Sequence, residues 1–322
     1  MTEPKSLQEA ILYFSEPANC REYLVARRWP NGVECPRCGS KNVLLLEKYN
    51  RWHCREKHDA PQFTLKTGTI MEESPIPVDK WLTAMWQIVN CKNGISSYEI
   101  AKAIGVTQKS AWFMDHRIRT ALSSGSLMKL GGGSGEVEAD ETFIGGKARN
   151  MHKSVKARRI SGQGHHRKDK VIVMGVLERG GHVRTEIIPD QTQKTLHPIV
   201  RKHVQAGTAL FTDELGGYKG LGGEYEHQII DHAVRYVDGK IHTNGMENFW
   251  SLLKRGLNGT YVSVEPFHLF RYLDEQVFRY IHRGSREHPV SDADRFNLAL
   301  SQIVGKRLTY AEVTGKTIPT PF

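Results

Sequence analysis

Apolar residues recur at intervals of three and four in two stretches near the start of the chain. In residues 5–29, Leu7, Ile11 and Phe14 fall on one face, and residues 78–91 repeat the spacing with larger side chains. This periodicity is that of an amphipathic helix packed on a core. We therefore expect helices in both stretches.

Two further helical patterns follow, over residues 98–104 and 108–122. Gly105 is placed to end the first helix, and Thr107 is a suitable N-cap for the second. Helix, turn and helix in this order are typical of a helix-turn-helix motif, although an ordinary helical hairpin has the same pattern. The basic residues expected to be exposed for DNA contact are Lys109, Arg117 and Arg119.

The second half of the chain changes to short strand-like runs. Strands are predicted at 136–143, 170–177, 182–188 and 209–213, and helices at 192–204, within 237–261 and at 267–281. Three strands, a helix, a strand and further helices are the connectivity of a ribonuclease H-like mixed sheet. The fold class predicted for the whole chain is α+β and multidomain.

Three acidic residues belong to these segments. Asp140 and Asp213 lie in the first and fourth strands, and Glu247 lies on a later helix. Carboxylate oxygens are ligands that Mg²⁺ and Mn²⁺ prefer, so we expect these three side chains to form a catalytic metal site. Lys254 lies seven residues after Glu247, near the same helical face, and we expect it to meet a phosphate together with Arg255.

Each acidic residue also has an ordinary structural interpretation. Glu138 shares the strand face of Asp140 and is an alternative ligand. Asp213 is placed to cap a helix that follows it. Asn244 and Glu247 have the spacing of a capping pair, and Asn244 is an alternative third ligand.

A second candidate metal site lies near the N-terminus. Residues 44–53 predict a short hairpin between two groups of metal-binding residues. The spacing C-x2-C-x15-C-x3-H predicts a closed structural Zn²⁺ site formed by Cys35, Cys38, Cys54 and His58. His53, beside Cys54, is an alternative to His58 as the fourth ligand. The alternative to a metal site is two surface thiols that have this spacing by chance.

Composition supports a polyanionic partner. The chain has 322 residues, a net charge of +10 and a pI near 9.3, which favours nucleic acid, although a merely basic protein has the same charge. Basic residues gather in 145–170, where Arg158 and Arg159 are candidates for DNA contact. An odd number of cysteines is typical of a reducing cytosol. No apolar run of about 18 residues and no secretory signal is apparent.

Several blocks of sequence resemble bacterial insertion-sequence transposases of the zinc-ribbon, ISXO-like group. The blocks are CPRCG, QFTLKTGTI with SPIPVDKW, EADETFIGG, FTDELGGY and HTNGMENFWSLLKRGLNGTY, in the order of the family. The resemblance implies a DDE-type enzyme with catalytic Asp140 and Asp213 and with Asn244 or Glu247 as third ligand. The chain departs from the family where Lys57 stands in place of a cysteine, with His58 next to it.

The resemblance implies a transposase that cleaves the ends of its element and joins the 3′ hydroxyl to target DNA. The expected partners are the terminal inverted repeats, the target DNA and at least one further copy of the chain, in the cytoplasm at the nucleoid and without a membrane. A DNA-binding regulator with an inactive catalytic fold and a standalone metal-dependent nuclease are the alternatives.

The glycine-rich residues 129–135 are expected to be a flexible linker between domains. The expected segments are 1–66 with the N-terminal helices and zinc ribbon, 67–128 with the helix-turn-helix, 136–283 with the ribonuclease H-like domain, and 284–322 as a C-terminal tail.

Overall fold

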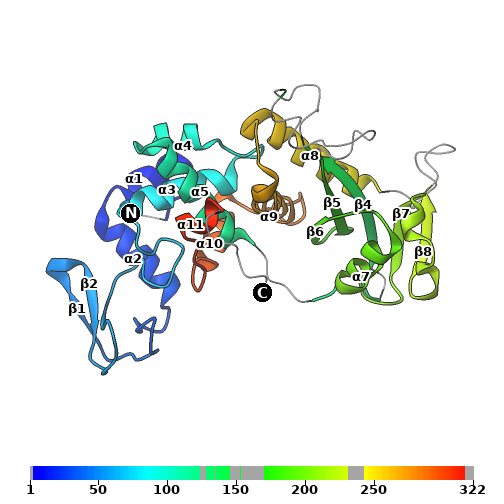
Figure 1. Ribbon diagram of the computed structural model, residues 1–322. Helices are drawn as coiled ribbons and strands as arrows, with labels where there is room; N and C mark the ends of the chain where they lie inside the picture. Colours follow the sequence, from blue (N-terminus) through cyan, green and yellow to red (C-terminus); the bar gives the residue numbers. More distant parts are fainter. Residues whose placement is uncertain are drawn as a thin grey trace. The chain divides into compact units, whose positions relative to one another are not determined.

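The computed structural model describes residues 3–123, 128–133, 135–145, 153, 170–230 and 243–315. These residues form two compact units (Figure 1). The N-terminal unit comprises Met1–Ser123 together with His282–Phe322, and the sheet unit comprises Ser124–Ile281.

The N-terminal unit is built around one central helix. Its helices are α1 Leu7–Phe14, α2 Pro17–Arg28, α3 Val78–Asn90, α4 Ser97–Ile104, α5 Gln108–Leu122, α10 Asp292–Ser301 and α11 Tyr310–Val313. Every residue from Trp81 to Val89 in α3 is buried. A helix that is apolar all round is covered on all sides, and the other helices provide that cover.

The C-terminal segment returns to this unit. Phe296 of α10 packs against Phe14, Tyr23 and Trp86, with ring centroids 4.9–6.1 Å apart. Ile70 N also donates a hydrogen bond of 3.0 Å to Ile303 O. Residues far apart in the sequence therefore share one core, and the described part of 284–322 is not a free tail.

The helix-turn-helix pattern is present between α4 and α5. Ser96 and Glu99 form a capping box at the start of α4, and Gly105 ends it with a left-handed φ of 62°. The Thr107 side chain accepts a hydrogen bond from Ser110 N, which confirms it as the N-cap of α5. Lys109 is exposed in the first turn of α5, as expected.

The predicted exposure of Arg117 and Arg119 is wrong. Their exposed fractions are 6% and 1%. Arg117 donates hydrogen bonds to Leu308 O (3.0 Å) and Glu72 O (2.8 Å), so it connects α5 to two other segments of the unit. The prediction relied on the basic residues of a helical pattern. It could not foresee that the C-terminal segment covers this face of α5.

A small antiparallel sheet projects from the N-terminal unit. Its strands are β1 Val43–Leu46, β2 Arg51–Cys54 and β3 Gln62–Phe63, paired in that order. The β1–β2 pair is the predicted hairpin. Trp52 stacks on Phe63, with ring centroids 5.9 Å apart, and this aromatic pair supplies much of the core that so small a sheet can form.

The sheet unit has the predicted ribonuclease H-like connectivity. Its strands are β4 Glu136–Ile144, β5 Val171–Glu178, β6 Val183–Ile188, β7 Ala209–Asp213 and β8 Glu226–Ile230, in the order β6-β5-β4-β7-β8. The first three strands pair antiparallel, and β7 and β8 add in parallel. Sequence periodicity missed β8 because Ile229 is 49% exposed and the strand lacks a clear apolar face.

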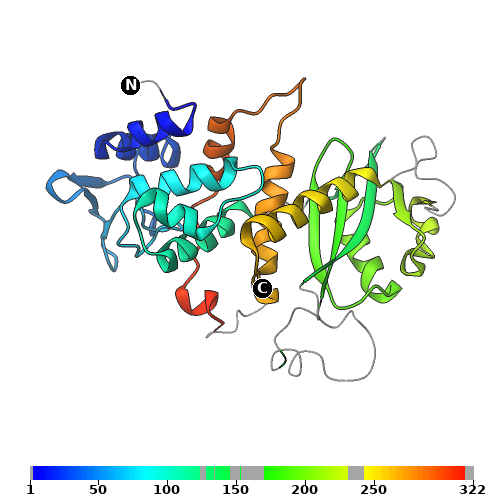
Figure 2. The same ribbon diagram turned by 90° about the horizontal axis from the view of Figure 1, so that it is seen from above.

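Helices cover both faces of this sheet (Figure 2). Leu196 and Val200 of α7 Gln193–His203 belong to the core on one face. On the other face, α8 Asn244–Gly256 and α9 Leu269–Ile281 pack on β5 and β6 through a second core. The site residues of β4 lie beneath α8.

The glycine-rich segment is not a free linker where the structure describes it. Leu130 is 3% exposed, and its N–H donates a hydrogen bond of 2.7 Å to His203 O. Gly131 and Gly132 have φ values of 79° and 90°. A Cβ on Gly131 would overlap the side chain of Thr208, and a Cβ on Gly132 would overlap that of Gln205. The glycines permit close approach to the sheet unit, so their composition was misleading as a sign of flexibility.

Candidate metal and catalytic sites

The four predicted zinc ligands converge beside the small sheet. The ligand atoms of Cys35, Cys38, Cys54 and His58 all lie within 4.8 Å of one another. The Cys35 Sγ to His58 Nε2 distance is 3.5 Å, and the Cys38 Sγ to Cys54 Sγ distance is 3.6 Å. A tetrahedron with metal–sulfur bonds of about 2.3 Å has edges of about 3.8 Å, so this donor set fits Zn²⁺.

The structure distinguishes His58 from its competitor His53. His58 Nδ1 lies 2.8 Å from Asp59 O, so it carries the proton and leaves Nε2 as the ligand atom. His53 is next to Cys54 in β2, and successive strand residues point to opposite faces. Burial raises the pKa of Cys35, but hydrogen bonds from the backbone of Arg37 and Cys38 outweigh it and lower this pKa to about 7.

The two predicted catalytic aspartates lie on one face of the large sheet. β4 and β7 are parallel, with Glu138 opposite Phe211. Because successive residues of a strand point to opposite faces, Asp140 shares the face of Glu138, and Asp213 shares the face of Phe211. Asp140 contacts Trp250 of α8 on this face. Arg179 confirms the shared face, because it pairs with Glu138 at 2.8 Å and lies 4.2 Å above the Phe211 ring.

Asp140 is held by two N–H donors. Glu141 N donates to Oδ1 at 2.8 Å, and the Trp250 indole donates to Oδ2 at 3.0 Å. Burial and the nearby charge of Asp213 raise the pKa of Asp140 to about 6, with a smaller contribution from Glu247. The three side chains therefore interact electrostatically, although their oxygens are not all within 4.8 Å of one another, in contrast to the zinc ligands.

Glu247 and Asn244 are both exposed on the first two turns of α8. Asn244 and Glu247 do not form the capping pair, since the N-cap is Thr243 and its side chain makes no capping hydrogen bond. Glu247 lies three residues before Trp250, which contacts Asp140, and its charge contributes to the Asp140 pKa.

Glu138, the alternative ligand, has a different role. It is 1% exposed, forms an ion pair with Arg179, and accepts a hydrogen bond of 2.9 Å from Met246 N. A carboxylate at a helix N-terminus stabilises the unpaired N–H groups there. Glu138 therefore attaches the start of α8 to β4.

Lys254 and Arg255 are exposed in the last turns of α8, as expected for residues that meet a phosphate. Lys254 also lines a cleft of 340 Å³ at the end of β4. Arg158 and Arg159 lie outside the described residues.

Sequence periodicity missed two residues that shape the acidic site. Gly175 of β5 pairs with Asp140, and a Cβ there would overlap Met246 Cε and lie 2.7 Å from Trp250 Cζ2. Only glycine therefore lets α8 approach closely enough for Trp250 to reach Asp140. On the opposite face, Tyr218 donates a hydrogen bond to Glu141, whose pKa is raised to about 7 by burial. For Gly175, the available signal in the sequence was a glycine inside a strand pattern.

We expect Gly175→Ala to destabilise the sheet unit by about 1–3 kcal/mol, because the added methyl group overfills the contact with α8. Urea denaturation would measure the change. Gly222→Ala is the matched control, since a Cβ there meets nothing within 4 Å. Equal stability of the two variants would contradict the proposed contact.

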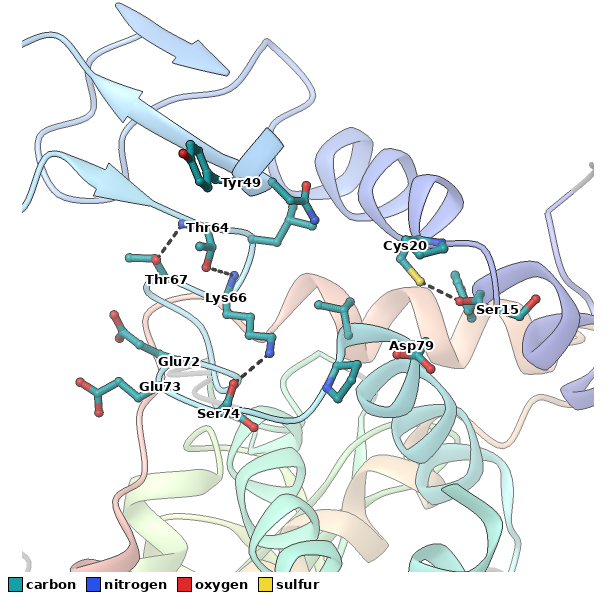
Figure 3. Close-up of a pocket in the computed structure, with 16 residues that line it drawn as sticks. Ser15, Cys20, Tyr49, Thr64, Lys66, Thr67, Glu72, Glu73, Ser74 and Asp79 are labelled. Carbon is teal, nitrogen blue, oxygen red and sulfur yellow. Dashed lines mark hydrogen bonds between the residues drawn. The ribbon is translucent and has the colours of Figure 1, made fainter. Parts of the chain in front are cut away.

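A cavity of 520 Å³ in the N-terminal unit contains none of the predicted site residues (Figure 3). Lys66 extends into it and donates to Ser74 O at 2.9 Å and Ile76 O at 2.5 Å. Acidic Glu72 and Asp79 also line it.

The fold and sites define a zinc-ribbon protein with a ribonuclease H-like domain. Residues 16–56 match the transposase zinc-ribbon domain, and residues 132–280 match the ISXO2-like transposase domain. The chain belongs to the ISXO2-like transposase family. Among the helices of the described ranges, none is both long and apolar enough for a membrane crossing.

Two relatives support the family assignment. An uncharacterised protein in the transposable element ISH50 of Halobacterium salinarum is 27% identical over 260 residues, which cover 77% of this chain and 85% of the relative. An uncharacterised transposase-like protein of Haemophilus influenzae is 30% identical over 99 residues, which cover 30% of this chain and 80% of the relative.

Proposed function

We propose that this transposase cleaves the ends of its element and joins the freed 3′ hydroxyl to target DNA by two-metal-ion phosphoryl transfer. Asp140, Asp213 and Glu247 are the proposed ligands of Mg²⁺ or Mn²⁺. The observation that supports the proposal is the sheet face of Glu138 and Phe211, which alternation assigns also to Asp140 and Asp213 and where Trp250 of α8 contacts Asp140.

The donor chemistry fits divalent ions. The three carboxylates offer hard oxygen atoms. Burial raises the pKa of Asp140, and repulsion from Asp213 and Glu247 adds to this rise. Each Asp140 oxygen accepts one N–H, which leaves a lone pair on both oxygens and suits a bridging ligand. Divalent ions bound there would stabilise negative charge at the reacting phosphate and activate water.

The proposed reaction has two displacements. A water oxygen attacks phosphorus at the element end, the P–O3′ bond breaks, and the leaving oxygen takes a proton to become a 3′ hydroxyl. That hydroxyl then attacks a target phosphate, whose own 3′ oxygen leaves. Lys254 and Arg255 are proposed to hold the phosphate, and Trp250 and Glu141 N orient Asp140.

Glu247 is the stronger proposal for the third ligand. A carboxylate neutralises a divalent ion, whereas the Asn244 amide does not. Glu247 also contributes to the charge around Asp140, three residues from the contacting Trp250. Asn244, one helical turn earlier, is then placed to contact DNA or substrate water.

The test is joining of a labelled element end to a plasmid in the presence of Mg²⁺. The end sequences are taken from the DNA that flanks the gene. Joined product supports the transposase reaction, cuts without joining indicate a nuclease, and binding without either indicates a regulator. We also propose that two copies pair the two ends, which the mass of the protein–DNA complex would measure.

The helix-turn-helix is proposed to contact the element end through Lys109. Lys109→Ala should weaken end binding and reduce the slope of log K against log salt by about 1. Arg117→Ala should instead cost about 1.5–3 kcal/mol of stability, because two buried carbonyls lose a charged donor. The readouts are fluorescence anisotropy across a salt series and urea denaturation. An unchanged salt slope for Lys109→Ala would contradict the contact.

The acidic site should make stability depend on pH. The pKa of Asp140 is raised to about 6 and that of Glu141 to about 7, so the folded chain binds more protons than the unfolded chain between about pH 4 and 7. Stability from these groups is therefore present at low pH and lost as pH rises through that window.

Without divalent ions, the stability of Asp140→Asn relative to the parent should rise by roughly 1–3 kcal/mol between pH 4 and pH 7, because only the parent loses a proton at this position in this range. Added Mn²⁺ should stabilise the parent but not the variant. Thermal unfolding across pH, with and without Mn²⁺, would measure both effects. A pH-independent difference would show that the carboxylate is not strained by its neighbours.

A further inference from the structure

The cleft of 340 Å³ lies where β4 ends and α8 passes into a turn of π-helix, Leu257–Tyr261. Its volume is at the small end of ligand-sized cavities, which run from about 300 to 1,000 Å³. Ile144, at its wall, is four residues beyond Asp140, or roughly 13 Å along the strand. The cleft is therefore close to the acidic site without including it.

The cleft combines apolar and polar groups that suit a single nucleotide. Ile144, Leu257 and Val264 provide apolar walls, and a cation, an amide, a hydroxyl and a carboxylate come from Lys254, Asn258, Ser263 and Glu265. Apolar walls suit a base face, an amide and a hydroxyl suit base edges, and an ammonium suits a phosphate. Lys254, Asn258 and Ser263 are exposed and thus accessible to DNA.

Val262, at the mouth of the cleft, has an unusual backbone. Its φ of 59° and ψ of −51° are rare for a β-branched residue. Ser263 N donates to Tyr261 O at 2.6 Å across it, which makes a strained γ-turn. Tyr261 fixes one side of the turn, since its hydroxyl donates to the buried Glu275 and its ring meets that of Tyr272 at 4.7 Å.

The strained turn presents an apolar side chain to solvent. Val262 is 78% exposed, so its side chain contributes little to the core. Strain of this kind persists only where the surroundings impose it, and it is concentrated at functional sites. Apolar side chains that enter a base step are a known means of unstacking DNA.

We propose that the cleft receives one nucleotide extruded from the duplex beside the cleaved phosphate, while Val262 fills the space that the base leaves. The extrusion would give Lys254 access to the adjoining phosphate. This inference rests on the proposed DNA cleavage for the position of the substrate, but it concerns DNA distortion and can be tested without cleavage.

The test places 2-aminopurine, in turn, at each position around the cleavage point of an element end. Fluorescence is measured with the full chain and without added Mg²⁺, while anisotropy on the same samples confirms binding. We expect a several-fold rise at one position or two adjacent positions. Val262→Ala and Val262→Gly should abolish most of the rise, and Val262→Gly should fold well because glycine accepts this backbone.

Ile187→Ala is the matched control, because Ile187 is an exposed apolar residue on β6. It should leave the rise unchanged. Bound DNA without a rise at any position would overturn the proposal, as would a rise that survives both Val262 variants. Loss of joining with an intact rise would count against the proposed reaction alone, so the two failures are distinguishable.

Discussion

Asp213→Asn should abolish cleavage and joining of element ends while leaving end binding close to that of the parent. The amide keeps the size of the side chain and an acceptor for Leu215 N, which now donates to Asp213 Oδ1 at 3.1 Å. It removes the negative charge that a divalent ion requires. Several kcal/mol of transition-state stabilisation depend on such an ion, so the expected loss is at least about 10³-fold.

The measurement is the yield of joined product under single-turnover conditions, with anisotropy for end binding. Glu214→Gln is the matched control, because Glu214 is the exposed acidic neighbour in the same turn. It should retain joining. Joining by Asp213→Asn at more than a tenth of the parent rate would remove Asp213 from the proposed metal site.

Cys35→Ser should release the zinc and unfold the small sheet. Structural Zn²⁺ contributes about 10–16 kcal/mol to folding in zinc-finger peptides, which is more than three short strands can replace. The aromatic contacts of Trp52 with Trp29 and Phe63 depend on that sheet and should be lost with it. Metal analysis should show zinc falling from about one equivalent toward none. Hydrogen exchange should rise across β1–β3 and stay low in the sheet unit.

Three further variants sharpen the zinc prediction. Cys91→Ser, at the end of α3 and outside the cluster, should retain the metal. His58→Ala should lose it, whereas His53→Ala should keep it, since His53 faces away from Cys54 along the strand. Full zinc retention by His58→Ala would contradict the ligand set.

The periodicity of apolar residues along the chain predicted most of the helices and strands. The helices α3, α4, α5 and α9 and the first four strands of the large sheet lie close to their expected ranges. These segments bury a continuous face, so their periodicity is strong. β8 was missed because an edge strand with an exposed isoleucine has no such face.

Charge and glycine content were weaker guides. Arg117 and Arg119 carry the composition of a DNA-contacting helix, but other segments of the N-terminal unit cover them. Gly131 and Gly132 have the composition of a flexible linker, but they approach Thr208 and Gln205 closely. In both cases the deciding contact comes from residues distant in the chain, which local patterns do not specify.

The sequence by itself determined the zinc ligand spacing, the succession of the first four strands along the chain and the acidic candidates, because these depend on residue type and short-range period. Tertiary structure decided which residues share a site. The pairing of β4 with β7 put Asp140 and Asp213 on one face of the sheet, and Gly175 allowed Trp250 to reach Asp140. The tertiary structure also pairs Glu138 with Arg179 and with the start of α8. A buried carboxylate requires such partners, and only the folded chain supplies them.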